Sequence, residues 1–184
     1  MIHNLYIFDF DGTLFNSPQP PDWWKDKSGW WNEIQSMTPP CLPKEPSAEW
    51  WVESTVKAVR EALKDEYNYV VLLTGRRDGT FNSRIHELLK QKDLNFDEVH
   101  LSDQSDTQAF KVAQIDRILE EHPAIETVDL WEDFVSMVLP YRATVKEEGA
   151  KFRLHKVKVE PRKAECTEDE FLTKKVALRY ASLV

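Results

Sequence analysis

The sequence predicts an α/β domain with a doubly wound, mainly parallel sheet. Two observations lead to this prediction. Short apolar runs typical of buried strands alternate with amphipathic segments at helical spacing between residues 4 and 133. Polar and charged residues directly follow several of these strands, and open parallel sheets bind ligands outside the carboxyl ends of their strands.

Length and composition predict one folded domain over residues 1–184. Apolar residues make up 41% of the chain and charged residues 30%, a balance that disordered chains do not have. No apolar run reaches the length of a membrane span, and the N-terminus has no signal-peptide pattern. Cys41 and Cys166 lie far apart without the spacing of a metal site. We therefore expect a cytoplasmic protein, a reducing compartment and no disulfide.

The charge distribution limits the possible partners. A net charge of −8 argues against general, tight binding of nucleic acids through their phosphates. The segment 142–163 differs, with eight Lys or Arg residues against three Glu. It is either a solvated strand face or a basic edge that holds a polyanionic substrate.

The first strand is expected at about residues 4–9, where the apolar run Leu5–Phe8 is broken by Gly12 and Thr13. An irregular, cap-like insert at 16–47 follows, because seven of the ten prolines lie there and proline at that density blocks regular structure. The insert also contains Trp23, Trp24, Trp30 and Trp31. Such side chains must be covered, so the insert forms either a satellite core under a long loop or a lid over the site.

The remaining elements alternate up to residue 133. We expect helices at 47–63, around 81–89 and at 107–122, and strands at 69–73, 96–101 and 126–133. A later run, 151–161, alternates like a strand but slips in phase at His155, which indicates a bulge in an antiparallel or edge strand. Thr167 and Glu170 have the spacing of a capping box, so a closing helix is expected from there to the C-terminus.

Asp9 and Asp11 end the first strand and suggest a reactive centre. Residues i and i+2 of a strand point to the same side, so both carboxylates could face one spot. Two carboxylates that close repel each other unless a cation or a transferring phosphate lies between them. The alternative is a simple strand-end turn, because Asp-Gly is a common turn signal.

Other polar residues are expected to converge on the same edge of the sheet. Thr74, Gly75 and Arg76 follow the second strand, Glu132 and Asp133 follow a later one, and Lys111 lies near the start of its helix. An acidic cage alone would repel phosphate, so this set requires a bound Mg²⁺. Each residue also has a simpler interpretation. Thr74-Gly75 could be an ordinary turn, Lys111 could be solvated, and Glu132-Asp133 could cap a helix. Arg76 and Arg77 are either surface charges or a grip on a substrate phosphate.

Four motifs, taken in order, resemble those of the haloacid dehalogenase-like (HAD) phosphohydrolases. They are "DFDGTLF", "VVLLTGR", "FK" before a helix, and "VDLWEDF". Between residues 4 and 141 the chain further resembles the HAD domain of fungal-type Swiss Army Knife RNA-repair proteins. This similarity includes "DGTLFNSPQP", the tryptophan-rich insert, "VLLTGRRDGTFNSRIHELLKQKDLNFDEVHL", "TQAFK" and "WEDF".

The resemblance implies catalytic roles. Asp9 is expected to be the nucleophile that forms an aspartyl-phosphate. Asp11 is expected to protonate the leaving oxygen, then activate the hydrolytic water, and to offer its backbone carbonyl to the metal. Thr74 is expected to hydrogen-bond a phosphoryl oxygen, and Lys111 to neutralise the nucleophile and the transferring group.

The resemblance also implies binding roles. The expected Mg²⁺ ligands are Asp9, Asp11, Asp133 and Glu132. The expected substrate-binding residues are Gly12, Thr13, Gly75 and Arg76.

One departure bears on the substrate. The repair-type subfamily is expected to have "EDRxxH", whereas here Phe134 follows Asp133 and Val135, Ser136 and Met137 come next. We expect a Mg²⁺-dependent phosphomonoesterase. Phosphorylated RNA or DNA ends are favoured as substrates because of the subfamily resemblance and the basic segment 142–163, and exposed tryptophans of the insert could stack on a terminal base. The alternatives are a small-molecule phosphatase or nucleotidase, and a non-catalytic binding module that retains the fold.

Overall fold

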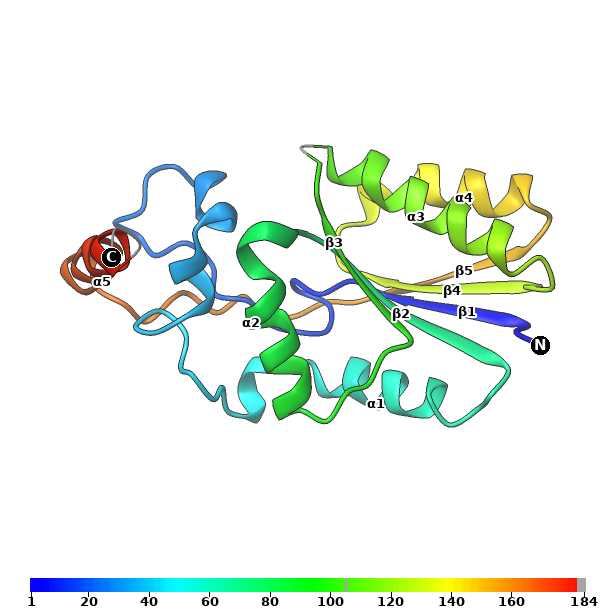
Figure 1. The fold of residues 1–184 in the computed structure, drawn as a ribbon, viewed down its shortest axis with the longest axis horizontal. Helices are drawn as coiled ribbons and strands as arrows, with labels where there is room; N and C mark the ends of the chain where they lie inside the picture. The colour runs from blue at the N-terminus through cyan, green and yellow to red at the C-terminus, as the bar shows by residue number, and fades with distance from the viewer. Residues whose placement is uncertain (105, 182–184) are drawn as a thin grey trace.

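The computed structural model describes residues 1–104 and 106–181, and these form a parallel sheet with helices on both faces (Figure 1). The five strands are β1 (Asn4–Phe8), β2 (Asn68–Arg77), β3 (Glu98–Ser102), β4 (Thr127–Glu132) and β5 (Lys151–Lys156). They lie in the order β3-β2-β1-β4-β5, and every neighbouring pair is parallel. The predicted doubly wound α/β fold is therefore confirmed.

Two hydrophobic cores flank the sheet because β1 is apolar on both faces. Phe8 packs into a core with α1 (Glu53–Ala62) and α2 (Asp78–Gln91). Leu5 and Ile7 face the other core, beneath α3 (Thr107–Glu121) and α4 (Val138–Glu147). A central parallel strand buried on both sides needs such a continuous apolar run. None of the described helices is long and apolar enough to cross a membrane.

The strand order places a topological switch at the centre of the sheet. The connections from β1 lead through β2 to β3 on one side, while β4 and β5 lie on the other. Loops therefore diverge at the carboxyl ends of β1 and β4, which is where ligands bind in such sheets. Asp9 directly follows β1 and Glu132 ends β4, so both lie at this switch point.

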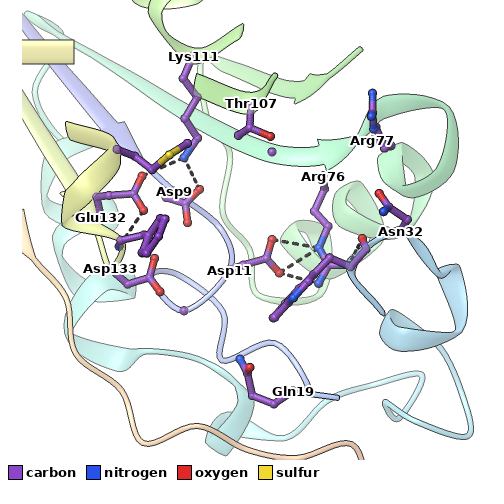
Figure 2. A pocket seen from close by; sticks show the side chains of 15 residues that line it. Asp9, Asp11, Gln19, Asn32, Arg76, Arg77, Thr107, Lys111, Glu132 and Asp133 are labelled. Carbon is purple, nitrogen blue, oxygen red and sulfur yellow. Dashed lines mark hydrogen bonds and ion pairs between the residues drawn. The ribbon is translucent and has the colours of Figure 1, made fainter. Parts of the chain in front are cut away.

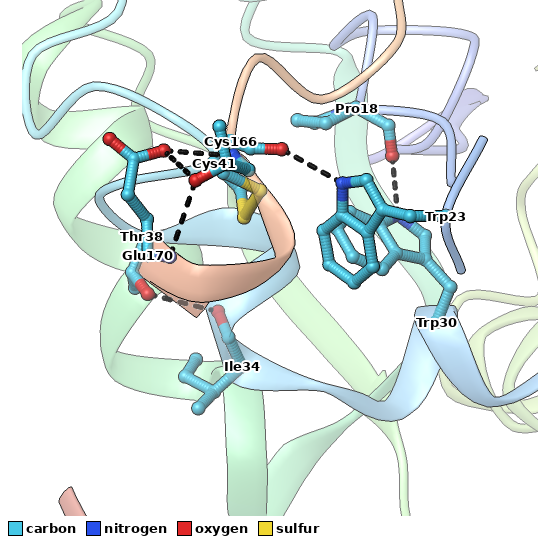
Figure 3. Close-up of a disulfide and its surroundings, with 9 residues drawn as sticks. Pro18, Trp23, Trp30, Ile34, Thr38, Cys41, Cys166 and Glu170 are labelled. Atoms are coloured by element: carbon cyan, nitrogen blue, oxygen red, sulfur yellow. Dashed lines mark hydrogen bonds between the residues drawn. A yellow bond between two sulfur atoms is a disulfide. The ribbon is translucent and has the colours of Figure 1, made fainter. Parts of the chain in front are cut away.

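The insert folds back onto the C-terminal part of the chain, beyond the carboxyl ends of the strands (Figure 1). It contains the short helices η1 (Gly29–Asn32) and η2 (Ile34–Met37), and a third, η3 (Ala48–Trp50), follows it. Its Trp30 and Cys41 form a small separate core with Phe171 of α5 (Glu168–Ala181). Tryptophan N–H groups find carbonyl partners: Trp30 donates to Pro18 over 2.7 Å and Trp23 to Cys166 over 3.0 Å (Figure 3). The insert therefore forms a satellite core, one of the two arrangements expected for it.

The expectation that there is no disulfide is wrong. Cys41 of the insert and Cys166, just before α5, form a disulfide within this small core (Figure 3). The two cysteines are 125 residues apart in sequence. Only the return of the insert to the C-terminal segment brings them together, and spacing along the chain carries no sign of that.

Two other differences concern the second half of the chain. The run at 151–161 is a parallel edge strand that ends at Lys156, rather than a strand with a bulge at His155. Arg153 and His155 both turn to Asp129 of β4, so the strand keeps its phase to its end. Helix α4, preceded by the turn η4 (Val135–Met137), was not predicted.

The closing helix begins as predicted. The backbone N–H of Thr167 donates to Glu170 over 2.8 Å, and the backbone N–H of Glu170 donates to the Thr167 hydroxyl over 3.3 Å. This is the reciprocal capping box that the sequence indicated. The last part of the predicted helix, 182–184, lies outside the described residues.

Candidate active site

A cavity of about 560 Å³ lies at the carboxyl end of the sheet (Figure 2). The predicted site residues that line it are Asp9, Asp11, Gly12, Gly75, Arg76, Lys111, Glu132 and Asp133. They come from the ends of β1, β2 and β4 and from the first turns of α3. The convergence that the strand ends predicted is therefore present.

A buried lysine joins two of the carboxylates. Lys111 Nζ lies 2.6 Å from Asp9 Oδ1 and 2.9 Å from Glu132 Oε2. Asp9 is fixed by its backbone N–H, which donates to Trp131 on the neighbouring strand over 3.1 Å. Lys111 is positioned by α3, whose first turn is capped when Asp106 accepts a bond from the N–H of Ala109. Each charge thus comes from a rigid element.

The electrostatics of this group reflect three buried charges in one place. Burial raises the pKa of Asp9 well above its usual range, and the nearby Glu132 raises it further, while Lys111 opposes both. Burial lowers the pKa of Lys111, but Asp9 and Glu132 outweigh that effect and raise it, so the amine stays protonated. Burial, followed by the hydrogen bond and charge of Glu132, raises the pKa of Asp133 to about 6. The group therefore has an excess of carboxylate over cation.

The donor set fits a hard divalent cation. Asp9, Glu132 and Asp133 each offer a carboxylate oxygen, and the three oxygens lie within 4.8 Å of one another. Carboxylate oxygens are the ligands that Mg²⁺ prefers, and a cation there would relieve the repulsion that raises the pKa of Asp9 and Asp133. The metal contact expected of Asp11 is its backbone carbonyl, which a cluster of side-chain oxygens does not test, so that role remains a prediction.

Gly12 allows the loop after β1 to approach Asp133. Its φ is +70°, and a Cβ atom there would lie 2.4 Å from Oδ2 of Asp133. Only glycine combines that backbone conformation with that proximity. The turn at "DGT" thus shapes the side of the cavity where the carboxylate cluster lies.

Asp11 faces a different partner from Asp9. Its carboxylate accepts bonds from Arg76 Nε over 3.0 Å and from Arg76 Nη2 over 2.7 Å (Figure 2). Both aspartates line the cavity, but they form separate pairs. Lys111 neutralises Asp9 and Arg76 neutralises Asp11, so the repulsion expected between the two aspartates is reduced.

Arg76 connects Asp11 to the insert. Its Nη1 donates to the carbonyl of Trp31 over 3.0 Å and to the hydroxyl of Ser36 over 3.2 Å. The guanidinium also lies over the rings of Trp31 and Phe81, 5.0 and 4.7 Å from their centroids. Only 3% of Arg76 is exposed. In this conformation the side chain is a buried connector, although substrate binding was its expected role.

Two predicted threonines lie outside the cavity lining. Thr74 is fully buried, and its hydroxyl accepts the backbone N–H of Arg76 over 3.2 Å. Thr13 is also fully buried, and its hydroxyl has no partner among the described residues. Gly75 does line the cavity, and a Cβ there would lie 2.6 Å from Cγ2 of Thr107. The roles expected for the two threonines remain predictions.

Several lining residues were missed by sequence reasoning. They are Gln19, Trp31, Asn32, Thr107 and Met137. The insert contributes the first three, and nothing in its irregular sequence indicates which of its residues turn inward. Phe134, noted as a departure, lines the cavity with 62% of its surface exposed.

Three of the eight basic residues in the segment 142–163 form ion pairs with acids. Arg153 lies 2.5 Å from Asp129, and Arg162 and Lys163 bridge to Glu49 and Asp22. Ion pairs of this kind weaken the field that the segment can present to a polyanion. For these three residues the ion pairs favour the solvated-face interpretation over a basic edge that holds a polyanion.

Comparison with known proteins gives a family match. The family model described as "HAD domain family 1 in Swiss Army Knife RNA repair proteins" matches residues 13–171. An uncharacterized protein of Saccharomyces cerevisiae, YMR265C, is 23% identical over 170 residues. That alignment covers 77% of this chain and 37% of the yeast protein, so the chain spans well under half of that relative.

Two solved structures share the fold. A chain of the Pnkp1/Rnl/Hen1 RNA repair complex superposes with a TM-score of 0.54 and 16% identity, over 86% of this chain and 44% of that one. The HAD domain of effector protein Lem4 from Legionella pneumophila gives a TM-score of 0.52 and 12% identity, covering 96% and 94% of the two chains. At these identities the likeness concerns the fold.

Proposed function

Since this chain belongs to HAD domain family 1 of the Swiss Army Knife RNA repair proteins, we propose that it is a phosphatase that hydrolyses phosphomonoesters. The observation that supports the proposal most directly is the joint placement of Asp9, Lys111 and Asp11 in one cavity. A nucleophile, a fixed cation and a second carboxylate are what a two-step phosphoryl transfer needs.

In the first step Asp9 is the nucleophile. One of its carboxylate oxygens forms a bond to phosphorus while the ester bond to the leaving oxygen breaks. Lys111, 2.6 Å from Asp9 Oδ1, orients the carboxylate and balances the charge that gathers on the phosphoryl oxygens. Asp11 donates its proton to the leaving oxygen, which departs as an alcohol.

In the second step the aspartyl-phosphate is hydrolysed. Asp11 takes a proton from a water molecule, whose oxygen attacks phosphorus as the bond to Asp9 breaks. Inorganic phosphate and a free Asp9 carboxylate are the products, and Asp11 is again protonated. Arg76 holds Asp11 through its fork in the ionised form, which is the form that takes the proton from water in this step.

Asp9, Glu132 and Asp133 would hold Mg²⁺ in this proposal. A bound Mg²⁺ would supply positive charge that lets a phosphate approach this acidic cavity. The Gly12 turn keeps Asp133 within reach of the other two ligands.

The substrate we favour is the phosphorylated end of an RNA chain. The family's description names RNA repair proteins, and one structural neighbour is part of an RNA repair complex. A nucleotidase-like activity on small substrates is the second candidate, because a cavity of about 560 Å³ lies within the range typical of small-molecule sites, roughly 300–1,000 Å³.

Phosphate release with Mg²⁺ tests the proposal on a 3′-phosphorylated RNA oligonucleotide and an aryl phosphate in parallel. We expect release from both, with higher kcat/KM for the oligonucleotide, and loss of both activities in Asp9→Asn. Release from the aryl phosphate alone would exclude the favoured substrate. Release from neither, or unchanged release in the variant, would contradict the proposed chemistry.

A further inference from the structure

The cations of the cavity differ in what they already bind. Among the described residues that line it, three are positively charged: Lys111, Arg76 and Arg77. Lys111 is buried between Asp9 and Glu132. Arg76 is buried against Asp11 and the insert. Neither can offer a full positive charge to the distal part of a substrate, because each is balanced by carboxylates.

Arg77, unlike Lys111 and Arg76, is not paired with a carboxylate of the described cavity residues. It ends β2 directly before α2, and its backbone is paired with Ser102 of β3, so its position is set by the sheet. Within residues 1–104 and 106–181, its side chain makes no ion pair or side-chain hydrogen bond, and it is partly exposed. An unneutralised guanidinium in a cavity suits a phosphate, which it can bind through two parallel hydrogen bonds.

The position of Arg77 in the cavity indicates which part of the substrate it can contact. In Figure 2, Asp9, Lys111, Glu132 and Asp133 lie on one side of the Asp11–Arg76 pair, and Arg77 lies on the other with Asn32 of the insert. The phosphate to be hydrolysed must reach Asp9, and its leaving oxygen must reach Asp11. The rest of the substrate, beyond the leaving oxygen, therefore extends toward Arg77 and Asn32.

We propose that Arg77, assisted by the Asn32 amide, binds a second phosphate group carried by the leaving alcohol of the substrate. This inference rests on the proposed function and refines it. The substrate class is then a nucleoside 3′-phosphate that also bears a 5′-phosphoryl group. That group is either the free phosphate of a nucleoside bisphosphate or the phosphodiester next to the 3′ end of an RNA chain.

The charge of the molecule strengthens the inference. The net charge is −8, and the carboxylates Asp9, Asp11, Glu132 and Asp133 face the same cavity. These carboxylates would repel a second substrate phosphate in the cavity unless a positively charged side chain bound it. Arg77 is positioned to meet it, and a substrate with a single phosphate gains nothing from that charge.

The test compares four substrates with Mg²⁺: an aryl phosphate, a nucleoside 3′-monophosphate, a nucleoside 3′,5′-bisphosphate and a dinucleotide with a 3′-phosphate. Each is assayed with the unmodified protein, Arg77→Gln, Arg77→Lys and the control Lys90→Gln. Lys90 is exposed at the far end of α2, the helix that follows Arg77, so the control makes the same charge change away from the cavity.

We expect substrates with the second phosphate to exceed the monophosphate in kcat/KM by about 10- to 100-fold, as one charge-assisted hydrogen-bonded contact provides. Arg77→Gln should abolish most of this kcat/KM preference for the second phosphate. Arg77→Lys should keep part of the preference, and Lys90→Gln should keep all of it. A preference for the dinucleotide over the bisphosphate would identify a chain end as the source, and the reverse would identify a small bisphosphate.

Either of two results would overturn the inference: an unmodified protein that does not prefer the second phosphate, or an Arg77→Gln variant that keeps the preference. Failure of the proposed function looks different, since then no substrate, including the aryl phosphate, releases phosphate. In that case calorimetric binding of the nucleoside 3′,5′-bisphosphate decides. Binding weakened about tenfold or more by Arg77→Gln supports the site, and equal binding overturns it.

Discussion

Arg76 and Arg77 are neighbours in sequence whose side chains have opposite surroundings. A two-residue period turns consecutive side chains of a strand to opposite sides, and the β2–β3 ladder also shifts register between Thr74 and Arg77. One guanidinium is thereby buried against Asp11, and the other is left at the cavity's edge. The sequence indicated two arginines near a phosphate site, but only the structure separates their roles.

The Asp11–Arg76 fork can be tested by a substitution that keeps the charge. Arg76→Lys cannot reproduce two parallel bonds, so Asp11 should lose its fixed position, and kcat should fall by about 100-fold, a typical cost of misplacing a catalytic group. Arg84→Lys is the matched control. Arg84 is also a buried arginine, on α2, that binds the insert through the carbonyls of Met37 and Pro43, but it contacts no site carboxylate.

The control should lower the melting temperature and leave kcat unchanged. Equal loss of kcat in the two variants, measured as phosphate release from an aryl phosphate, would show that the fork has no special role. Unchanged kcat in Arg76→Lys would contradict the positioning of Asp11 directly.

Gly12 can be tested against another glycine with positive φ. Gly12→Ala and Gly149→Ala both place a Cβ in the left-handed region, at φ of +70° and +80°, which should cost each variant about 1–2 kcal/mol of stability. Only at Gly12 would the new Cβ meet Asp133, at 2.4 Å, whereas Gly149 has nothing within 4 Å. We therefore expect similar unfolding free energies but a raised Mg²⁺ requirement for Gly12→Ala alone, measured by metal titration of activity. Matching Mg²⁺ curves for the two variants would refute the placement of Asp133.

Glu98 provides a pH-dependent contribution away from the site. Burial raises the pKa of Glu98, but hydrogen bonds from His100, Arg117 and Tyr69 outweigh it and lower the value to about 2. Because the folded pKa lies below the ordinary value of 4.5, the stabilisation is complete above that pH and is lost as pH falls toward 2.

Glu98→Gln should therefore lower the free energy of unfolding at pH 7, and the difference from the unmodified protein should shrink between pH 5 and pH 3. Urea unfolding at several pH values measures this. A difference that does not vary with pH would mean that the carboxylate charge contributes nothing.

At the scale of elements, the strands and helices that were predicted correctly are those whose apolar residues recur at a regular spacing and whose first residue carries a recognisable signal. β1, β2 and β4 were visible because strands buried on both faces have continuous apolar runs. Helix α4 was missed because its sequence has exposed Leu139 and contains Pro140 in its first turn, which weakens the periodic pattern. The direction of β5 was left open because an edge strand is half exposed and its register depends on β4.

The sequence predicted where the insert lies along the chain, but not which residues it would contact in the fold. Its prolines predicted irregular structure, and its tryptophans predicted that it would be covered. The residues that cover it, Phe171 of α5 and Cys166, come from the far end of the chain. Contacts over such a separation leave no local pattern, and this is why the disulfide and the cavity-lining Trp31 were not foreseen.

The disulfide should stabilise the contact between the insert and the C-terminal segment. It closes a loop across a sequence separation of 125 residues, and losing such a link typically costs about 2–5 kcal/mol. Reduction should therefore lower the melting temperature of the unmodified protein. A Cys41→Ser/Cys166→Ser double variant should melt at the lower temperature with or without reductant. Equal melting of the oxidised and reduced protein would show that the two cysteines are not paired in solution.

At the scale of the whole molecule, the sheet domain is joined to the insert through a shared core. Met37 and Leu42 of the insert pack into the core of the sheet, while Trp30 and Cys41 form the small core with Phe171. The sheet and its four flanking helices place four carboxylates and one lysine at the switch point. The insert and α5 form the second part and supply Trp31, Asn32 and the anchor of Arg76. The motif residues of the first part were predictable because polar residues directly follow the ends of parallel strands, where ligands bind. The second part was not, since it depends on tertiary contacts.

In the proposed mechanism Asp9 becomes phosphorylated during turnover, and trapping that phosphoryl group on the protein is the decisive experiment. Asp11→Asn is mixed with Mg²⁺ and an aryl phosphate whose good leaving group needs no proton, and the phosphorylated protein is sought by mass spectrometry of its peptides. We expect a burst of one equivalent of aryl alcohol per protein, followed by slow turnover, with the phosphoryl group on Asp9. Turnover is slow because the residue that activates water is missing. Turnover without a burst, or a phosphoryl group on any other residue, would contradict this mechanism.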